Sequence, residues 1–143
     1  MPTEPIPISK TKIIVPHRRP ELLSRTRLLE SLKVLLDNKL LLLSAPAGYG
    51  KTSLLIDLAS HTTMPVCWLS LDLLDRNPQR FLAYLIASLA EQFPRVGETS
   101  RVQLHQLRSI EEDAESILVT LTNELYENAE NDFLLIIDEV LGK

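Results

Sequence analysis

The sequence predicts an α/β protein whose mainly parallel sheet is covered by helices on both faces. Residues 40–43 have the continuous hydrophobicity of a strand buried on both sides, and residues 133–137 form a second apolar run that predicts a buried strand. Between them, apolar residues recur at intervals of three and four, the spacing of amphipathic helices. Strands that alternate with helices are typical of parallel sheets.

Residues 40–52 have the pattern of a phosphate-binding P-loop, reading Leu-Leu-Leu-Leu-Ser-Ala-Pro-Ala-Gly-Tyr-Gly-Lys-Thr. A strand, a loop and a helix follow one another, which is the context that this motif requires. Gly48 and Gly50 tolerate positive φ, so that main-chain N–H groups can surround a triphosphate. The following helix N-terminus also favours an anion. We therefore expect a P-loop NTPase three-layer sandwich with a mainly parallel sheet.

Each position of this loop has an expected task. Lys51 would reach the β- and γ-phosphates as a catalytic residue, and the Thr52 hydroxyl would ligate Mg²⁺. Ala45 replaces the first glycine of the general motif, a mild change if φ stays negative. The alternative is a chance Gly-Lys-Thr on a surface turn, which the flanking strand and helix disfavour. The residues expected to contact the nucleotide are Ala45, Pro46, Ala47, Gly48, Tyr49, Gly50, Lys51, Thr52 and Ser53.

Residues 133–139 have the pattern of a Walker B strand, an apolar run that ends in Asp138 and Glu139. Ligands of open parallel sheets collect at the carboxyl ends of the strands. Asp138 would hold Mg²⁺ directly or through water. Glu139 would polarise the attacking water as a catalytic general base. An apolar run before two acids is common, but its position about eighty residues after a P-loop makes it informative.

The rest of the chain divides into a Pro-rich lead-in, residues 1–20, and a partial P-loop domain, residues 21–143. We expect the lead-in to be extended on the surface or partly disordered, with local packing possible for residues 11–16. A first helix begins at Ser24 and ends near Asn38. A second short buried strand occupies residues 66–71.

Two further helices are expected in the second half of the chain. The first is capped by Asn77, has Pro78 at its first position and stops at Pro94. Residues 95–107 read as a loop with at most one helical turn, in which His105 is exposed. The second helix begins with a capping box of Ser109 and Glu112. Its expected buried face consists of Ile110, Ala114, Ile117, Leu118, Leu121 and Leu125.

Composition limits the class of protein. The chain has 143 residues, of which 45% are hydrophobic and 24% charged, as in one soluble domain. The net charge of −4 argues against nucleic acid as a partner of this segment. Cys67 is the only cysteine, so no internal disulfide can form. We see no signal peptide and no run long enough to cross a membrane, and we expect a cytoplasmic protein.

These stretches together resemble the N-terminal part of the large ATP-binding LuxR-family transcriptional regulators, of the STAND class of P-loop NTPases. The matching stretches are 11–12, 19–20, 23–29, 44–52, 68–72, 77–82 and the Asp138 strand. The resemblance implies ATP and Mg²⁺ as ligands and Arg25 near the adenine. A solvated basic face on the first helix explains Arg25 equally well.

The same resemblance implies self-association in the full-length protein and DNA binding only through a C-terminal domain absent here. It also implies that a later strand, absent here, would lie between the P-loop strand and the Walker B strand. The expected sheet is therefore incomplete, with its C-terminal strands missing.

The function expected from these observations is an ATP-binding, slowly hydrolysing switch segment of a signal-responsive LuxR-type activator. If the segment is an enzyme, it is a slow ATPase with a regulatory purpose. Two alternatives stay open: a small-molecule P-loop kinase, and a non-catalytic truncated fragment that pairs with other copies. ATP is expected rather than GTP because the resemblance implies it and no guanine-reading Asn-Lys-x-Asp is present.

Overall fold

The computed structural model describes residues 6–16, 51–130 and 132–139. Its elements in chain order are η1 (Lys10–Lys12), α2 (Lys51–His61), β1 (Val66–Leu71), η2 (Leu73–Arg76), α3 (Pro78–Gln92), α4 (Ser100–His105), α5 (Ile110–Asn128) and β2 (Leu134–Glu139). The predicted strand at 40–44 and the predicted helix at 24–38 lie outside the described residues, as does the domain boundary at residue 20. Within the described part, no helix is long and apolar enough to cross a bilayer.

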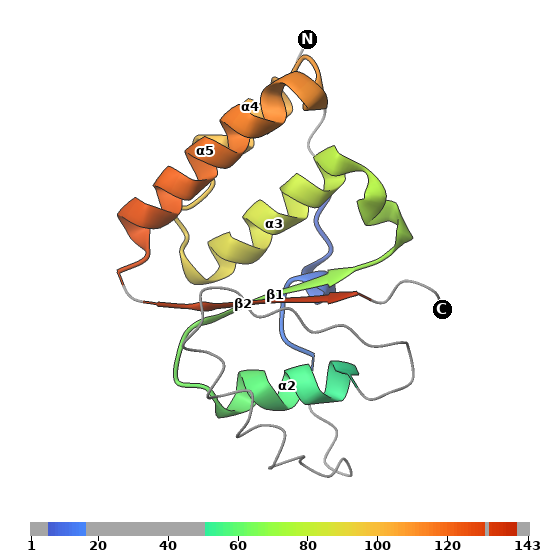
Figure 1. Ribbon diagram of the computed structural model, residues 1–143, viewed down its shortest axis with the longest axis vertical. Helices are drawn as coiled ribbons and strands as arrows, with labels where there is room; N and C mark the ends of the chain where they lie inside the picture. The colour runs from blue at the N-terminus through green and yellow to red at the C-terminus, as the bar shows by residue number, and fades with distance from the viewer. Residues whose placement is uncertain (1–5, 17–50, 131, 140–143) are drawn as a thin grey trace.

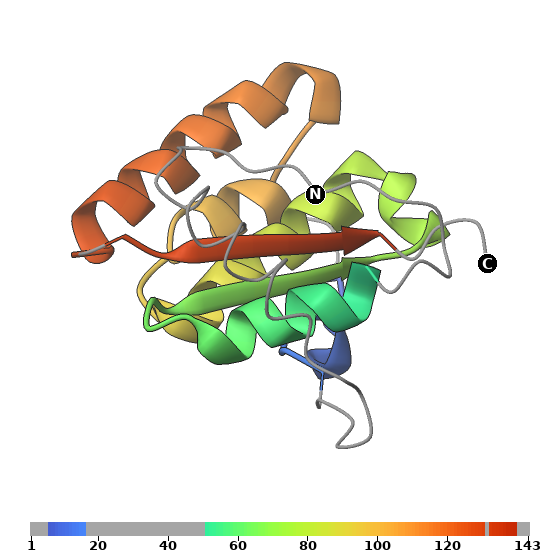
Figure 2. The same ribbon diagram turned by 60° about the horizontal axis from the view of Figure 1, so that its bottom comes forward.

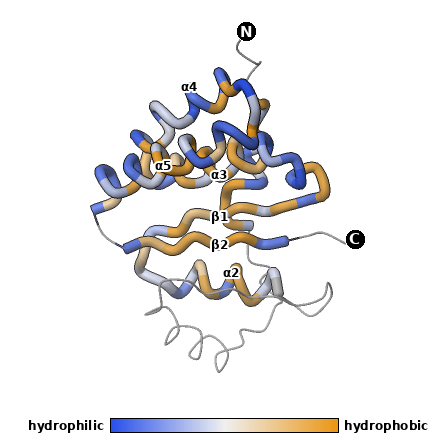
Figure 3. The backbone as a smooth tube through the Cα atoms, turned by 45° about the horizontal axis from the view of Figure 1, so that its top comes forward, coloured by the Kyte–Doolittle hydropathy of each residue, from blue (hydrophilic) through white to orange (hydrophobic). Residues whose placement is uncertain are grey.

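The two described strands pair in parallel, so the predicted α/β class with parallel pairing is confirmed. The register sets Cys67 beside Leu135, Ser70 beside Asp138 and Leu71 beside Glu139. Both strands therefore end at the same edge of the sheet. Figure 3 shows the two mainly hydrophobic strands lying between helices of mixed hydropathy.

Helices cover both faces of this sheet. Figures 1 and 2 show α2 on one face and α3 on the other, with α4 and α5 beyond α3. Because side chains of a strand alternate between faces, Trp68 and Ile136 pack with Leu55 and Ile56 of α2. Cys67 points the other way and packs with residues of α3. The two helical layers thus follow from the alternation of side chains between the two faces of each strand.

The expected burial of β2 is found on one face of the strand only. Ile136 is buried against α2, but Leu135 and Ile137 on the other face are 36% and 41% exposed. The apolar run predicted a buried strand. Hydrophobicity alone does not report whether a neighbouring element covers each face.

The expected start of α3 is confirmed. The Asn77 side chain accepts a hydrogen bond from the Arg80 backbone N–H at 3.1 Å, and Pro78 occupies the first helical position. The fully buried Tyr84 and Ser88 were not predicted to face the core. The Ser88 hydroxyl donates to the Trp68 carbonyl at 2.9 Å, so that α3 is tied to β1 by a buried hydrogen bond.

Residues 95–107 contain more structure than the sequence predicted. Val96 and Leu104 are buried in the core that also includes Ile117 and Leu121 of α5, and Leu104 belongs to the six-residue helix α4. The Glu124 carboxylate accepts hydrogen bonds from the backbone N–H groups of Gly97, Thr99 and Ser100 at 2.8, 3.2 and 3.2 Å. This buried carboxylate fixes the polar segment, which explains why local periodicity gave no signal.

The predicted capping box of Ser109 and Glu112 at the start of α5 was wrong. Ser109 is the N-cap residue, but its side chain makes no capping hydrogen bond and instead donates to Glu111 at 2.6 Å. Asp113, not Glu112, reaches back and accepts from the Arg108 backbone N–H at 2.7 Å. On the predicted buried face, Ile117 is buried, whereas Leu118 is 44% exposed.

The described part of the N-terminal lead-in packs into the core. Ile13, which is 4% exposed, contacts Leu69 and Tyr84. The Ser9 backbone N–H donates to the Tyr84 hydroxyl at 3.0 Å, and Lys12 forms an ion pair with the buried Asp75. Residues 6–16 therefore do not lie only on the surface. The packing that was left open for residues 11–16 is observed at Ile13.

Candidate nucleotide-binding site

The hydroxyl of Thr52 donates a hydrogen bond of 2.7 Å to Oδ2 of Asp138. Thr52 lies in the first turn of α2, and Asp138 is the next-to-last residue of β2. Asp138 is 1% exposed and lies on the same strand face as Ile136, the face that packs against α2. The parallel sheet and the helix therefore bring together the two residues that were predicted to share a metal ion.

A third polar group, Ser70, stands beside this pair and was not predicted. Ser70 is opposite Asp138 in the sheet register. The Trp68 indole N–H donates to its hydroxyl oxygen at 2.8 Å, which leaves the Ser70 proton for another acceptor. A serine near the carboxyl end of an otherwise apolar strand was the signal that could have identified it.

Glu139 differs from Asp138 in its surroundings. Consecutive strand residues point to opposite faces, and Glu139 is exposed at the end of β2, beside Leu71 of β1. The two carboxylates are thus close in the chain but sit in different environments. The catalytic role of Glu139 stays a prediction.

Most of the predicted loop lies outside the described residues. This applies to Arg25 and to Ala45, Pro46, Ala47, Gly48, Tyr49 and Gly50. Lys51 begins α2, but its side chain is also outside the described set. Ser53 is half-buried in the first turn of that helix. The described part of the site is therefore Thr52, Ser53, Ser70, Asp138 and Glu139.

The donor set fits magnesium bound together with phosphates. Within the described ranges, no group of three or more His, Cys, Asp or Glu side chains is placed to hold a metal ion. Mg²⁺ keeps several waters and takes one or two protein oxygens beside the phosphates of its partner ligand. A threonine hydroxyl and one buried carboxylate are oxygen donors of this kind.

The fold and the site define a parallel α/β protein with a hydroxyl–carboxylate pair at the carboxyl edge of its sheet. No protein-family model matches the chain. Over 97% of its length the chain is 31% identical to the serine/threonine-protein kinase PknK of Mycobacterium tuberculosis. It is 40% identical over 57% of its length to the HTH-type transcriptional regulator MalT of Cronobacter sakazakii. With MalT of Yersinia enterocolitica the identity is 36% over 70% of the chain.

The chain corresponds to a small part of each of these relatives. It spans 12% of the kinase and 9% and 11% of the two regulators. The predicted resemblance to LuxR-family transcriptional regulators is thus confirmed over part of the chain by its similarity to MalT. The similarity to a protein kinase was not predicted.

Proposed function

We propose that this chain binds ATP with Mg²⁺ through residues 45–53 and Asp138. The single observation that supports the proposal best is the hydrogen bond between Thr52 and Asp138. In the expected complex, Thr52 and Asp138 hold the metal, while Lys51 and the loop N–H groups neutralise the phosphates. Arg25 would lie near the adenine. The bound metal would supply charge neutralisation at the phosphates.

The broader role that we propose is that of a regulatory switch of the STAND class, within a longer LuxR-type transcription activator. The relatives with the names PknK and MalT differ in their stated activity, yet both contain a segment similar to this chain. A nucleotide-dependent switch is a device that a kinase and a transcription regulator can share. ATP would favour an active, self-associated state, and slow hydrolysis assisted by Glu139 would reset it. DNA contact would belong to another domain.

Calorimetric titration with ATP, with and without Mg²⁺, tests the proposal. Lys51→Ala should weaken ATP binding at least about tenfold, since a charge-assisted contact to phosphate contributes roughly 1.5–3 kcal/mol. Asp138→Asn should abolish the gain in affinity that Mg²⁺ provides. Asp132→Asn is the matched control, because this exposed aspartate lies just before the opposite end of β2.

Three results would contradict or redirect the proposal. Equal ATP affinity of the wild type and Lys51→Ala, with both chains folded by circular dichroism, would refute the phosphate role. ADP formation that requires a second small-molecule substrate would favour the kinase alternative. Failure to bind ATP, together with co-purification of several copies, would favour the non-catalytic fragment.

A further inference from the structure

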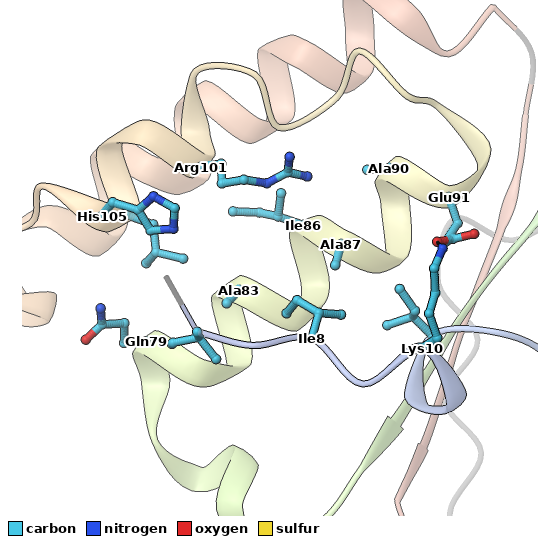
Figure 4. Close-up of a pocket in the computed structure, with 13 residues that line it drawn as sticks. Ile8, Lys10, Gln79, Ala83, Ile86, Ala87, Ala90, Glu91, Arg101 and His105 are labelled. Carbon is cyan, nitrogen blue, oxygen red and sulfur yellow. Dashed lines mark hydrogen bonds and ion pairs between the residues drawn. The ribbon is translucent and has the colours of Figure 1, made fainter. Parts of the chain in front are cut away.

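A cavity of about 290 Å³ lies between the N-terminal segment, α3 and α4 (Figure 4). It is on the α3 side of the sheet, whereas Asp138 faces α2, so it is separate from the candidate nucleotide site. Its volume is close to the lower end of the range for small-molecule sites.

The floor of the cavity is apolar and open because α3 presents small residues there. Ala83, Ala87 and Ala90 recur at intervals of four and three, which places them on one face of the helix. Ile8 of the N-terminal segment and Leu104 of α4 supply further apolar wall. Such a surface favours an apolar ligand body of limited width.

Positive and negative charges at the rim of the cavity do not balance. On one side Lys10 and Glu91 form an ion pair and compensate each other. On the other side Arg101 and His105, four residues apart on α4, extend over the cavity (Figure 4). Within the described part of the chain, no ion pair or hydrogen bond engages the Arg101 guanidinium. The rim therefore carries one uncompensated positive charge.

Gly97 and Glu124 help to define the position of the Arg101 side chain. Gly97 has φ +99°, and a Cβ atom added there would lie 3.2 Å from Nη2 of Arg101 and 2.7 Å from Ile86. The missing side chain leaves room for the guanidinium. The buried Glu124 carboxylate holds Gly97 and the start of α4 through their backbone N–H groups. The chain thus positions the charge instead of leaving it on a loose loop.

We propose that this cavity binds a small molecule with a narrow apolar body and a single carboxylate group. The body would lie against the alanine face of α3, and the carboxylate would pair with Arg101 at the mouth. A planar guanidinium matches a carboxylate with two parallel hydrogen bonds. An apolar cation would be repelled by the same group.

Calorimetric titration of the 143-residue chain with octanoate tests this proposal, with 1-octanol as the uncharged analogue. We expect saturable one-to-one binding of octanoate and weaker binding of octanol. Arg101→Gln should weaken octanoate binding by about fivefold, the upper range for an exposed ion pair, and leave octanol unchanged. The control Arg108→Gln, an exposed arginine that does not line the cavity, should have no effect.

A second variant tests the cavity itself. Ala87→Leu should fill the floor and abolish binding of both probes, while the methyl signals of Ile13 and Ile86 should shift on octanoate addition only in the wild type. Asp138→Asn should leave octanoate binding intact, which separates this proposal from the nucleotide site. Equal affinity for octanol and octanoate, or binding unaffected by Ala87→Leu, would overturn it.

Discussion

Oγ1 of Thr52 and Oδ2 of Asp138 lie 2.7 Å apart, although 86 positions separate the residues in the chain. The contact joins the first turn of α2 to the carboxyl end of β2. It closes the α2 layer onto the sheet at the edge where parallel α/β sheets collect their ligands. The same bond is therefore both structural and, in our proposal, functional.

Replacing Thr52 by Val should destabilise the chain by about 1–3 kcal/mol, because the buried Asp138 carboxylate loses a hydrogen-bond donor. Urea denaturation followed by circular dichroism measures this change. Thr63→Val is the control, since Thr63 is exposed after α2 and should shift stability by less than about 0.5 kcal/mol. An equal effect of the two substitutions would contradict the stabilising role of the bond.

Two neighbouring lysines of η1 should differ in their contribution to stability. Lys12 is 13% exposed, pairs with the buried Asp75 and lies 4.5 Å from the centre of the Tyr84 ring. Lys12→Met should cost about 2 kcal/mol, since the buried Asp75 loses one ion-pair partner and keeps its ion pair with Arg80 and the hydrogen bond from the Asp72 backbone N–H.

Lys10→Met provides the matched comparison in the same denaturation experiment. The Lys10 side chain is 72% exposed, and its ion pair with Glu91 should contribute less than about 0.5 kcal/mol. If Lys10→Met were the more damaging variant, the anchoring of the N-terminal segment through Lys12 would be wrong.

Glu124 should make the stability dependent on acid pH. Burial raises its pKa, but hydrogen bonds from Ser100 and from the backbone N–H groups of Thr99, Ser100 and Gly97 outweigh burial and hold the pKa below its ordinary value of 4.5. A lowered folded-state pKa means that the carboxylate stabilises the fold fully above about pH 4.5. This stabilisation is lost as the pH falls through the folded-state value.

Thermal denaturation between pH 7 and pH 3 checks this expectation. Glu124→Gln should lower stability at pH 7 by about 1–2 kcal/mol, and its deficit relative to wild type should shrink in acid. Asp72, whose pKa is lowered by the hydrogen bond from Lys12, contributes equally to both proteins. The exposed Glu127→Gln, on the same helix, should behave like wild type. A constant deficit at all pH values would refute the ionic contribution.

Cys67 should be unreactive in the folded chain. It is 1% exposed, and burial raises the pKa of its thiol to about 12, so almost no thiolate exists at neutral pH. Ellman's reagent should label it only after denaturation. A cysteine introduced at the exposed Ser116 in a Cys67→Ala background should react at once, as the positive control. Rapid labelling of native Cys67 would show that the core opens readily.

Local sequence patterns predicted the elements where short-range chemistry determines them. Asn77 followed by Pro78 marked the start of α3 because capping involves only neighbouring residues. The strand at Val66–Leu71 was predicted with its observed bounds because its apolar run ends where polar residues begin. Asp138 was identified from a motif whose acid always follows an apolar strand.

The sequence-based predictions were wrong where burial or a hydrogen-bond partner depends on other parts of the fold. Leu118 fits a helical period but is 44% exposed, and α4 has little period of its own yet is held by Glu124 from another helix. At the start of α5, Asp113 and not Glu112 accepts hydrogen bonds from the Arg108 and Ser109 backbone N–H groups. His105 was expected to be exposed but is half-buried at the cavity rim.

The sequence by itself determined the kinds of element, their order and the residue types suited to phosphate and magnesium, because these depend on local spacing. Only the tertiary structure decided that Thr52 meets Asp138, that Ile13 closes the core and that a cavity opens beside α3. Those relationships depend on how layers pack across long stretches of chain, and packing follows from the combined shape of many side chains.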